Sequence, residues 1–224
     1  MTRSHSPRRH ASLWFSFALA AVALVPSTGC LHLLLATGIY VMQGGNLVPP
    51  ECDALEEKRV VVLCRPPASH EFRQAGAARQ LADRVSGLLQ DNVPGIDVVS
   101  QRKVDEWIDE NDPGEFEELG RAVNADLVLL IELSHFELFN GQTMYQGNTD
   151  VTLTVVDVKD KGRRVWDKPM GEVLFPIHSG IAVQDKSAQQ FQRDFVAVVA
   201  NEISRNFHKH DPHANFAIDA LANK

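Results

Sequence analysis

The residues best suited to chemistry gather near the end of the chain, in the sequence HKHDPH at 208–213. Three imidazoles and one carboxylate lie within this stretch, and both groups are common metal ligands. However, Pro212 interrupts the stretch, and the sequence offers no second group that would orient the ligands. We therefore interpret it as a solvated tail with adventitious affinity for nickel or zinc, and we predict no metal site.

Calcium is the other ion to consider, because of the acidic run at 105–118. In an EF-hand loop that begins at Asp109, the fifth ligand position would be Pro113 and the bidentate glutamate position would be Gly120. Neither residue has a side-chain oxygen. The run is therefore interpreted as a solvated helix face.

Enzymatic motifs are also missing from the sequence. The chain has no nucleophile elbow, zinc-protease helix, phosphate-binding loop or dinucleotide-binding glycine pattern, so we predict no catalytic residue and no cofactor. A triad that assembles only in space would leave no such motif, which keeps a metal-binding or hydrolytic periplasmic protein as an alternative. His135 lies in a strand-like stretch and is interpreted as a residue whose ring is satisfied by a hydrogen bond.

The charge of the chain limits its partners. The formal net charge is -7, with 44% hydrophobic and 23% charged residues. An acidic chain lacks the basic face that neutralises phosphates, so we predict no binding to nucleic acid.

The start of the chain has the pattern of an export signal. Arginines near the amino terminus precede an apolar run at 11–25, which is too short to span a membrane because spanning takes about 20 apolar residues. The sequence STGC at 27–30 resembles the lipobox of bacterial lipoproteins, with Ser27 where that family usually carries a leucine-like residue. The resemblance implies that residues 1–29 are a signal peptide and that Cys30 carries the lipid.

An uncleaved membrane anchor is the alternative to lipidation. Residues 12–36 are long enough to cross a bilayer, and a kink at Pro26 would be tolerated. The chain would then be held by an inner-membrane signal anchor. As a lipoprotein it is expected in the cell envelope, facing the periplasm, with the outer membrane preferred over the inner membrane.

Residues 30–57 are predicted to join the anchor to the domain. Residues 31–42 are apolar and would lie at the bilayer surface. Residues 43–57 contain a glycine pair and a proline pair, which predicts a linker that is flexible at one end and stiffer at the other, with a reach of roughly 50 Å. Any partner must therefore sit close to the same membrane.

The apolar pattern predicts one domain at 58–209 and a tail at 210–224. Continuous β-branched runs indicate buried strands, alternation indicates a half-buried strand, and spacings of three and four residues indicate amphipathic helices. The predicted strands lie at 58–67, 96–100, 125–139, 149–158 and 163–175, and the predicted helices at 77–92, 101–110, 115–124 and 188–208.

Short polar residues mark the ends of these elements. Ser100 and Ser187 are predicted to cap the helices that follow them, and Pro169 within the last strand suits an edge of the sheet. Turns are predicted at 140–141, 147–148 and 160–162.

The order of the elements predicts a topology. The early helical crossovers require parallel pairing, and the late hairpins require antiparallel pairing. Right-handed crossovers then place the first strand between the second and the third. We predict a single α/β domain of two or three layers, with a mixed five-stranded sheet in the order 2-1-3-4-5 and helices packed on it.

Three stretches of this domain resemble a known superfamily. They are the strand and helix start at 96–101, LGRAVNADLVLL at 119–130 and VVDVKDKGRRVW at 155–166. They resemble the bacterial envelope superfamily of small lipoprotein domains that includes the penicillin-binding-protein activator lipoprotein, the curli-secretion pore lipoprotein and the TolB amino-terminal domain. The resemblance covers roughly residues 58–205. It implies an α/β domain that docks to other envelope proteins and has no catalytic group.

The function predicted from the sequence is that of a lipid-anchored, non-catalytic adaptor or assembly factor for envelope proteins of unknown identity. The alternative is a subunit of an oligomeric secretion or envelope complex, formed by self-association. The connections have no room for the hairpins of the curli lipoprotein, so we expect no pore. The candidate partner-binding residues are Gln142, Tyr145 and Asn148 near a turn, and Arg163 and Arg164 on the edge strand.

Two further cysteines follow Cys30. Cys52 and Cys64 could form a disulfide in an oxidising compartment. Cys64 ends an apolar strand, however, and is interpreted instead as a small buried side chain.

Overall fold

The structure is a computed structural model that describes residues 47–67, 71–112, 114–178 and 180–212. The predicted signal peptide, the lipidation site Cys30 and the apolar stretch that follows it lie outside the described residues. Among the described helices, none has both the length and the apolar character needed to cross a bilayer.

A mixed sheet forms the centre of the domain, and its strand order, β2-β1-β3-β4-β5, is the predicted one. β1 is parallel to both β2 and β3, whereas β3, β4 and β5 pair as antiparallel hairpins. The strands are β1 (Arg59–Arg65), β2 (Asp97–Val98), β3 (Leu127–Asn140), β4 (Met144–Asp157) and β5 (Arg163–Phe175). A short strand that the sequence analysis did not predict, β6 (Ile181–Ala182), pairs with the start of β4.

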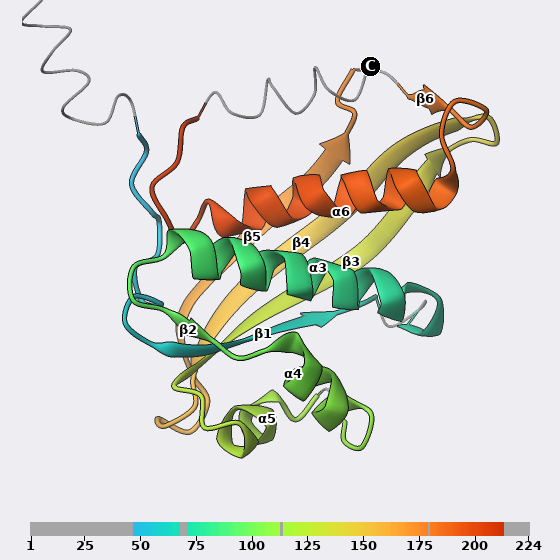
Figure 1. The fold of residues 1–224 in the computed structure, drawn as a ribbon. Helices are drawn as coiled ribbons and strands as arrows, with labels where there is room; N and C mark the ends of the chain where they lie inside the picture. Colours follow the sequence, from blue (N-terminus) through green and yellow to red (C-terminus); the bar gives the residue numbers. More distant parts are fainter. Residues whose placement is uncertain (1–46, 68–70, 113, 179, 213–224) are drawn as a thin grey trace, which may run out of the picture. The chain divides into compact units, whose positions relative to one another are not determined.

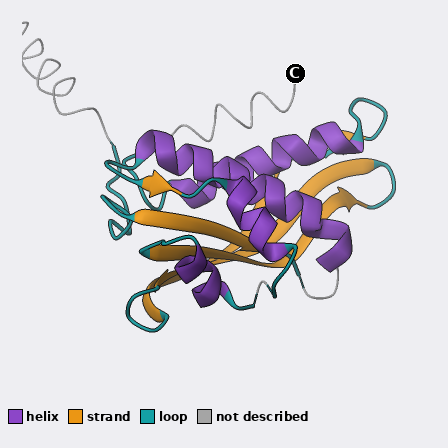
Figure 2. Ribbon diagram, turned by 60° about the horizontal axis from the view of Figure 1, so that its bottom comes forward, coloured by secondary structure: helices purple, strands orange, loops and turns teal. Residues whose placement is uncertain are grey.

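Helices cover both faces of the parallel part of the sheet. α3 (Glu71–Asn92) and α6 (Ala188–Ser204) lie side by side on one face (Figure 1). α4 (Gln101–Ile108) and α5 (Phe116–Ala122) lie against β1 and β3 on the other face (Figure 2). Among the described elements, no helix covers that second face over β4 and β5, so the domain has three layers at one side and two at the other.

The larger core lies between the sheet and the helices α3 and α6. The helical spacing seen in the sequence places one stripe of α3 over the sheet, and α6 adds buried rings. The stripe residues Leu81, Ala82, Val85 and Leu89 are buried together with Phe191, Phe195 and Val199 of α6.

A smaller core lies on the opposite face. Side chains alternate along β1, so Val61 and Leu63 point away from α3 and pack with Val104 of α4 and Leu119 of α5. β1 is therefore buried on both faces, as its continuous apolar run predicts.

The two predicted helix caps have different outcomes. The Ser187 hydroxyl accepts a hydrogen bond of 3.2 Å from the backbone N–H of Gln190, which confirms the cap of α6. Ser100 occupies the equivalent position before α4, but its side chain makes no capping hydrogen bond, and that prediction is wrong. Ser100 is exposed, so water can satisfy the first N–H groups of α4 in its place.

The predicted turn at 147–148 is also wrong, because β4 runs through both residues. Gly147 has another role. A Cβ atom placed on it would lie 2.4 Å from Cγ of Phe195, so glycine lets α6 approach the strand closely. The reversal of the chain falls at 141–143 instead.

Candidate docking surfaces

The structure separates the five predicted partner-binding residues. Gln142 is exposed in the β3–β4 turn, whereas Arg163 and Arg164 are exposed at the start of β5. These positions lie at opposite ends of β4, which is 14 residues long and therefore spans about 45 Å. One small partner surface cannot include all of them.

Tyr145 belongs to the core. Its side chain is buried, and its ring stacks on Phe191 with centroids 5.0 Å apart. The ring of Phe139 lies tilted against it, with centroids 5.1 Å apart. The ring is therefore not presented to a partner, in contrast to the expectation from the sequence. The alternation along β4 explains this placement, since Tyr145 points to the same side as the buried Val151 and Leu153.

Asn148 points to the opposite side of β4, onto the uncovered part of the sheet. There Nε2 of His135 contacts Oδ1 of Asn148 at 2.7 Å, and Nδ2 of Asn148 donates a hydrogen bond of 2.6 Å to Oε1 of Glu172. The second ring nitrogen of His135, Nδ1, lies 3.4 Å from Oδ2 of Asp150. The network thus crosses three strands, and it satisfies the His135 ring by a hydrogen bond, as the sequence predicts.

The strand register arranges this network as a row. His135 of β3 lies opposite Asp150 of β4, and Asp150 lies opposite Glu172 of β5. Like charges that face each other directly across strands are unfavourable. The carboxylates of Asp150 and Glu172 are therefore adjacent, with the imidazole of His135 on one side and no described strand on the other.

The opposite end of the sheet carries structural ion pairs. Lys159 donates to Oδ1 of Asp126 at 2.5 Å, and the backbone N–H of Arg59 donates to its other oxygen at 3.0 Å. The bond from Lys159, followed by that from Arg59, lowers the pKa of Asp126. Arg163 pairs with Asp160 at 2.5 Å within the hairpin. These contacts link β1, β3 and the β4–β5 hairpin. The charged groups named here thus pair with one another, and their positions do not require a bound ligand.

A backbone clasp joins the two ends of the domain. The backbones of Val48 and His210 form an antiparallel bridge, and the N–H groups of Glu51 and Cys52 both donate to the carbonyl of Asn206, at 2.8 and 3.0 Å. Cys52 is 6% exposed and belongs to the larger core. Residues 48–52, expected to be part of a linker, thus pack on the domain, whose compact unit begins at Val48.

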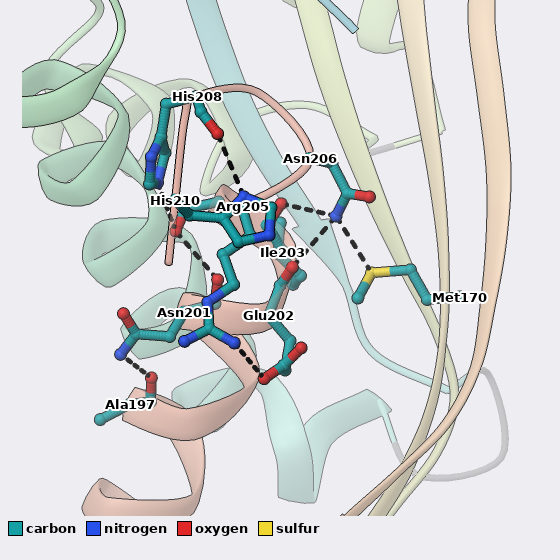
Figure 3. A network of polar contacts seen from close by, with 10 residues as sticks. Met170, Ala197, Asn201, Glu202, Ile203, Arg205, Asn206, His208 and His210 are labelled. Atoms are coloured by element: carbon teal, nitrogen blue, oxygen red, sulfur yellow. Dashed lines mark hydrogen bonds and ion pairs between the residues drawn. The ribbon is translucent and has the colours of Figure 1, made fainter. Parts of the chain in front are cut away.

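The side chain of Asn206 contacts the end of α6 and Met170 of β5 (Figure 3). Its Nδ2 donates to the carbonyls of Glu202 and Ile203, at 3.0 and 2.9 Å, and lies 3.9 Å from Sδ of Met170. Its Oδ1 accepts a hydrogen bond of 2.9 Å from Nζ of Lys168. The amide is buried and fully used. It ties α6 to the edge strand β5.

The histidines near this clasp contact groups that are close to them in the sequence. Nδ1 of His210 lies 3.2 Å from the carbonyl of His208, and Nε2 of His208 lies 3.4 Å from Oγ of Ser204 (Figure 3). Within the part of the chain that the structure describes, no group of three histidine, cysteine or acidic side chains is arranged to hold a metal ion. His213 lies outside the described residues.

Cys52 and Cys64 are free thiols. Burial raises the pKa of both thiols, and for Cys64 burial is the sole cause. The thiolate is the reactive form. Cys52 is therefore a small core side chain, whereas Cys64 is partly buried and packs against the larger core.

Sequence reasoning missed Asp150 and Asn206, and it included Lys168 and Glu172 only within a candidate edge strand at 163–172, without a role for either side chain. Signals for two of them exist. Asp150 alternates with the apolar residues of β4, and Glu172 follows the Pro169–Gly171 interruption that marks an edge strand. No local pattern indicates that Asn206 would receive the segment near Val48, because the two are far apart in the chain.

Comparisons with known proteins identify similar folds at low similarity. No family model matches the chain, and no curated protein matches it. Among solved structures, a PelC dodecamer from Paraburkholderia phytofirmans is 16% identical, with 73% of this chain and 99% of that chain covered and a TM-score of 0.45. The lipoprotein GNA1162 from Neisseria meningitidis is 16% identical, with 65% and 97% covered and a TM-score of 0.41. At these values the similarities carry no argument about anchoring, assembly or activity.

Proposed function

We propose that this chain is a lipid-anchored protein of the bacterial cell envelope that acts without catalysis, by docking to another envelope protein. The observation that carries this proposal is the clasp. The clasp holds residues 48–52, which follow the predicted leader, against the domain. The hydrogen bonds that do this run from the N–H groups of Glu51 and Cys52 to the carbonyl of Asn206. A domain whose first described segment is fixed in this way is suited to a role at a membrane surface.

The anchor rests on the sequence of the leader. A basic start, an apolar run and small residues before Cys30 are the features that lipoprotein processing uses. If residues 31–42 lie at the bilayer surface, residues 43–47 are the free connection. Such a connection reaches roughly 18 Å, so the domain would meet partners close to the membrane. Because the anchor raises the local concentration there, even a weak interface could be occupied.

The docking role rests on the uncovered part of the sheet. The face of β3, β4 and β5 that points away from α6 carries polar side chains, including His135, Asn148 and Glu172, and it is bordered by an edge strand. Sheet edges and open sheet faces are common sites of protein recognition. The polar groups described above bind one another or close the fold, and among the described residues no exposed serine, threonine or cysteine side chain is hydrogen-bonded to a histidine ring.

We propose a different protein as the partner, in preference to a second copy of this chain. β5 contains Pro169, and its register with β4 shifts beside it, between Val151 and Thr152. Such irregularities oppose the long strand pairing that a symmetric edge-to-edge dimer uses. Assembly into an oligomeric complex is therefore the alternative function. Size measurement of the detergent-solubilised chain by light scattering decides between the two.

Mass spectrometry of the mature amino terminus tests the anchor. We expect the chain to begin at a diacylglyceryl-modified Cys30 and to be recovered with membranes. The matched variant Cys30→Ser should stay unprocessed and lack the lipid mass. An intact Met1 in the wild type would replace the lipid anchor with a signal anchor.

Crosslinking in membranes tests the docking role. We expect one envelope protein to be recovered in stoichiometric amount with the wild-type chain after crosslinking and purification. Wild-type chain that remains without any stoichiometric partner under these conditions would contradict the docking role, whatever the state of Cys30.

A further inference from the structure

We propose that residues 171–175 of β5 accept an extended segment of the partner protein as an additional strand, and that this segment carries Lys or Arg opposite Glu172. An apolar residue two positions away would lie opposite Leu174. This inference deepens the docking role proposed above, and it rests on that role only for the existence of a partner. It specifies the surface and the sequence pattern that this surface selects.

The first argument is the free edge. β5 is the last strand on its side of the sheet, and among the described strands it pairs with β4 alone. Gly171 and Glu172 are exposed, and Val173 and Leu174 are partly exposed. An unpaired edge presents a row of backbone N–H and C=O groups, which an extended segment can bind.

The second argument is the charge at that edge. Glu172 lies directly opposite Asp150, so two carboxylates face each other across the strands. Glu172 receives a hydrogen bond from Asn148, but it forms no ion pair with any described residue. A strand added outside β5 would place its own side chain next to Glu172, where a cation forms a favourable cross-strand pair. This cation would complete the row His135, Asp150, Glu172.

The third argument is the next row of side chains across the strands. It defines the second position of the sequence pattern expected in the partner segment. Glu137 of β3 lies opposite Asn148, and Asn148 lies opposite Leu174. Leu174 is partly exposed on the same face as Glu172, because residues two apart on a strand share a face. An apolar side chain of the added strand would cover Leu174. The cation and the apolar residue are therefore two positions apart in the partner segment, whether that segment runs parallel or antiparallel to β5.

The length of the added strand is limited by the shape of β5. Gly171 has a φ of +74°, and the register with β4 shifts beside it. This bend divides the edge, so continuous pairing would stop at Gly171. The partner segment is therefore short, about five residues, and its affinity depends on the Glu172 pair as well as on backbone hydrogen bonds.

Peptide binding to the full-length chain in detergent micelles tests this inference. The probe is a fluorescein-labelled peptide of seven residues, in which threonines surround one lysine and one valine two positions apart. Two matched peptides have glutamate in place of the lysine, or N-methyl groups on the backbone nitrogens of alternate residues, the latter made in both registers. Fluorescence anisotropy reports binding.

We expect the lysine peptide to bind, the glutamate peptide to bind at least about fivefold more weakly, and one N-methylated register to lose binding. The variant Glu172→Lys should weaken the lysine peptide about five- to tenfold, since a favourable cross-strand pair becomes a repulsive one. Glu137→Lys makes the same change of net charge two strands away from the edge. It should change the affinity less than twofold.

Each contrary result overturns a stated part of the inference. Absence of binding by the lysine peptide removes the site. Equal binding by the glutamate peptide, or equal effects of Glu172→Lys and Glu137→Lys, removes the charge pattern. Undiminished binding of both N-methylated peptides shows docking on the face and overturns strand addition. None of these results depends on whether Cys30 carries a lipid, so failure here is distinct from failure of the anchor.

Discussion

The ammonium group of Lys168 donates a hydrogen bond of 2.9 Å to Oδ1 of Asn206, and this bond joins the edge strand β5 to the turn after α6. Lys168 also pairs with Glu51 at 2.6 Å. The segment near Val48, the turn after α6 and the edge strand therefore meet at one place. Residues 48–52 and the edge strand that contains the proposed docking site are therefore parts of one packed unit.

Replacement of Asn206 should loosen this junction. Asn206→Ala removes the side-chain bonds to two carbonyls and to Lys168 at a buried position. We expect a loss of about 2 kcal/mol in the free energy of unfolding, because buried partners are left unsatisfied. Denaturant unfolding measures the loss. In the control Asn201→Ala, a single local bond to the carbonyl of Ala197 is lost, and the cost should stay below about 1 kcal/mol.

A methyl group at Gly147 should destabilise the core. Its Cβ would lie 2.4 Å from the Phe195 ring, so Gly147→Ala forces α6 or the ring to move. Overpacking of this kind costs about 1–3 kcal/mol.

The matched control is Gly87→Ala, in the middle of α3. There an added Cβ meets nothing within 4 Å, and alanine favours the helix by roughly 0.5–1 kcal/mol. The two variants should therefore shift the thermal midpoint in opposite directions. Equal shifts would contradict the close approach of α6 to β4.

The ion pair of Asp126 should make stability depend on pH in the acid range. The pKa of Asp126 is lower in the folded protein than in the unfolded chain, because Lys159 and the Arg59 amide bind its carboxylate. Its contribution is thus present above the unfolded pKa of about 4, and it is lost as the pH falls through the folded pKa. Asp126→Asn should be less stable than the wild type at pH 7, and the two should converge at acid pH.

Denaturant unfolding across pH 7 to 2 measures this difference. The control is Glu106→Gln, which removes an exposed pair with Arg102 within α4 and should change stability by less than about 1 kcal/mol. A constant gap between Asp126→Asn and the wild type down to the lowest pH would show that the Asp126 ionisation is not responsible.

Thiol labelling reports on burial and on the anchor together. Burial raises the pKa of Cys64 and of Cys52, so neither should react with iodoacetamide at pH 8 while the protein is folded. In denaturant, the mass of the labelled chain should show two alkylated thiols if Cys30 carries a lipid and three if it does not. Rapid labelling of Cys52 in the folded chain would contradict its place in the core.

Much of the fold follows from local sequence patterns. The continuous run of β1 gave a strand buried on both faces, and the stripe of α3 gave a helix over the sheet. The strand order followed because right-handed crossovers and tight hairpins leave few arrangements. Short stretches of sequence encode these features, because the periodicity of apolar residues defines each element and the handedness of the backbone limits how neighbouring elements connect.

The positions of individual side chains on the surface were harder to predict from the sequence. Tyr145 and Asn148 were expected together at a turn, yet one is buried and the other lies on the open face. A shift of one residue in a strand exchanges the two faces. The extension of β4 through Gly147 therefore decided both side chains, and this extension depends on the packing of Phe195.

The sequence by itself determined the acidic character of the chain, the element types and their order in the sheet, and it predicts a leader that ends before Cys30. Only the tertiary structure decided that Asp150 faces Glu172 at an unpaired edge, and that residues 48–52 close on Asn206. Both relationships join residues distant in the chain. Their geometry is set by strand register and helix packing, which no short stretch of sequence encodes.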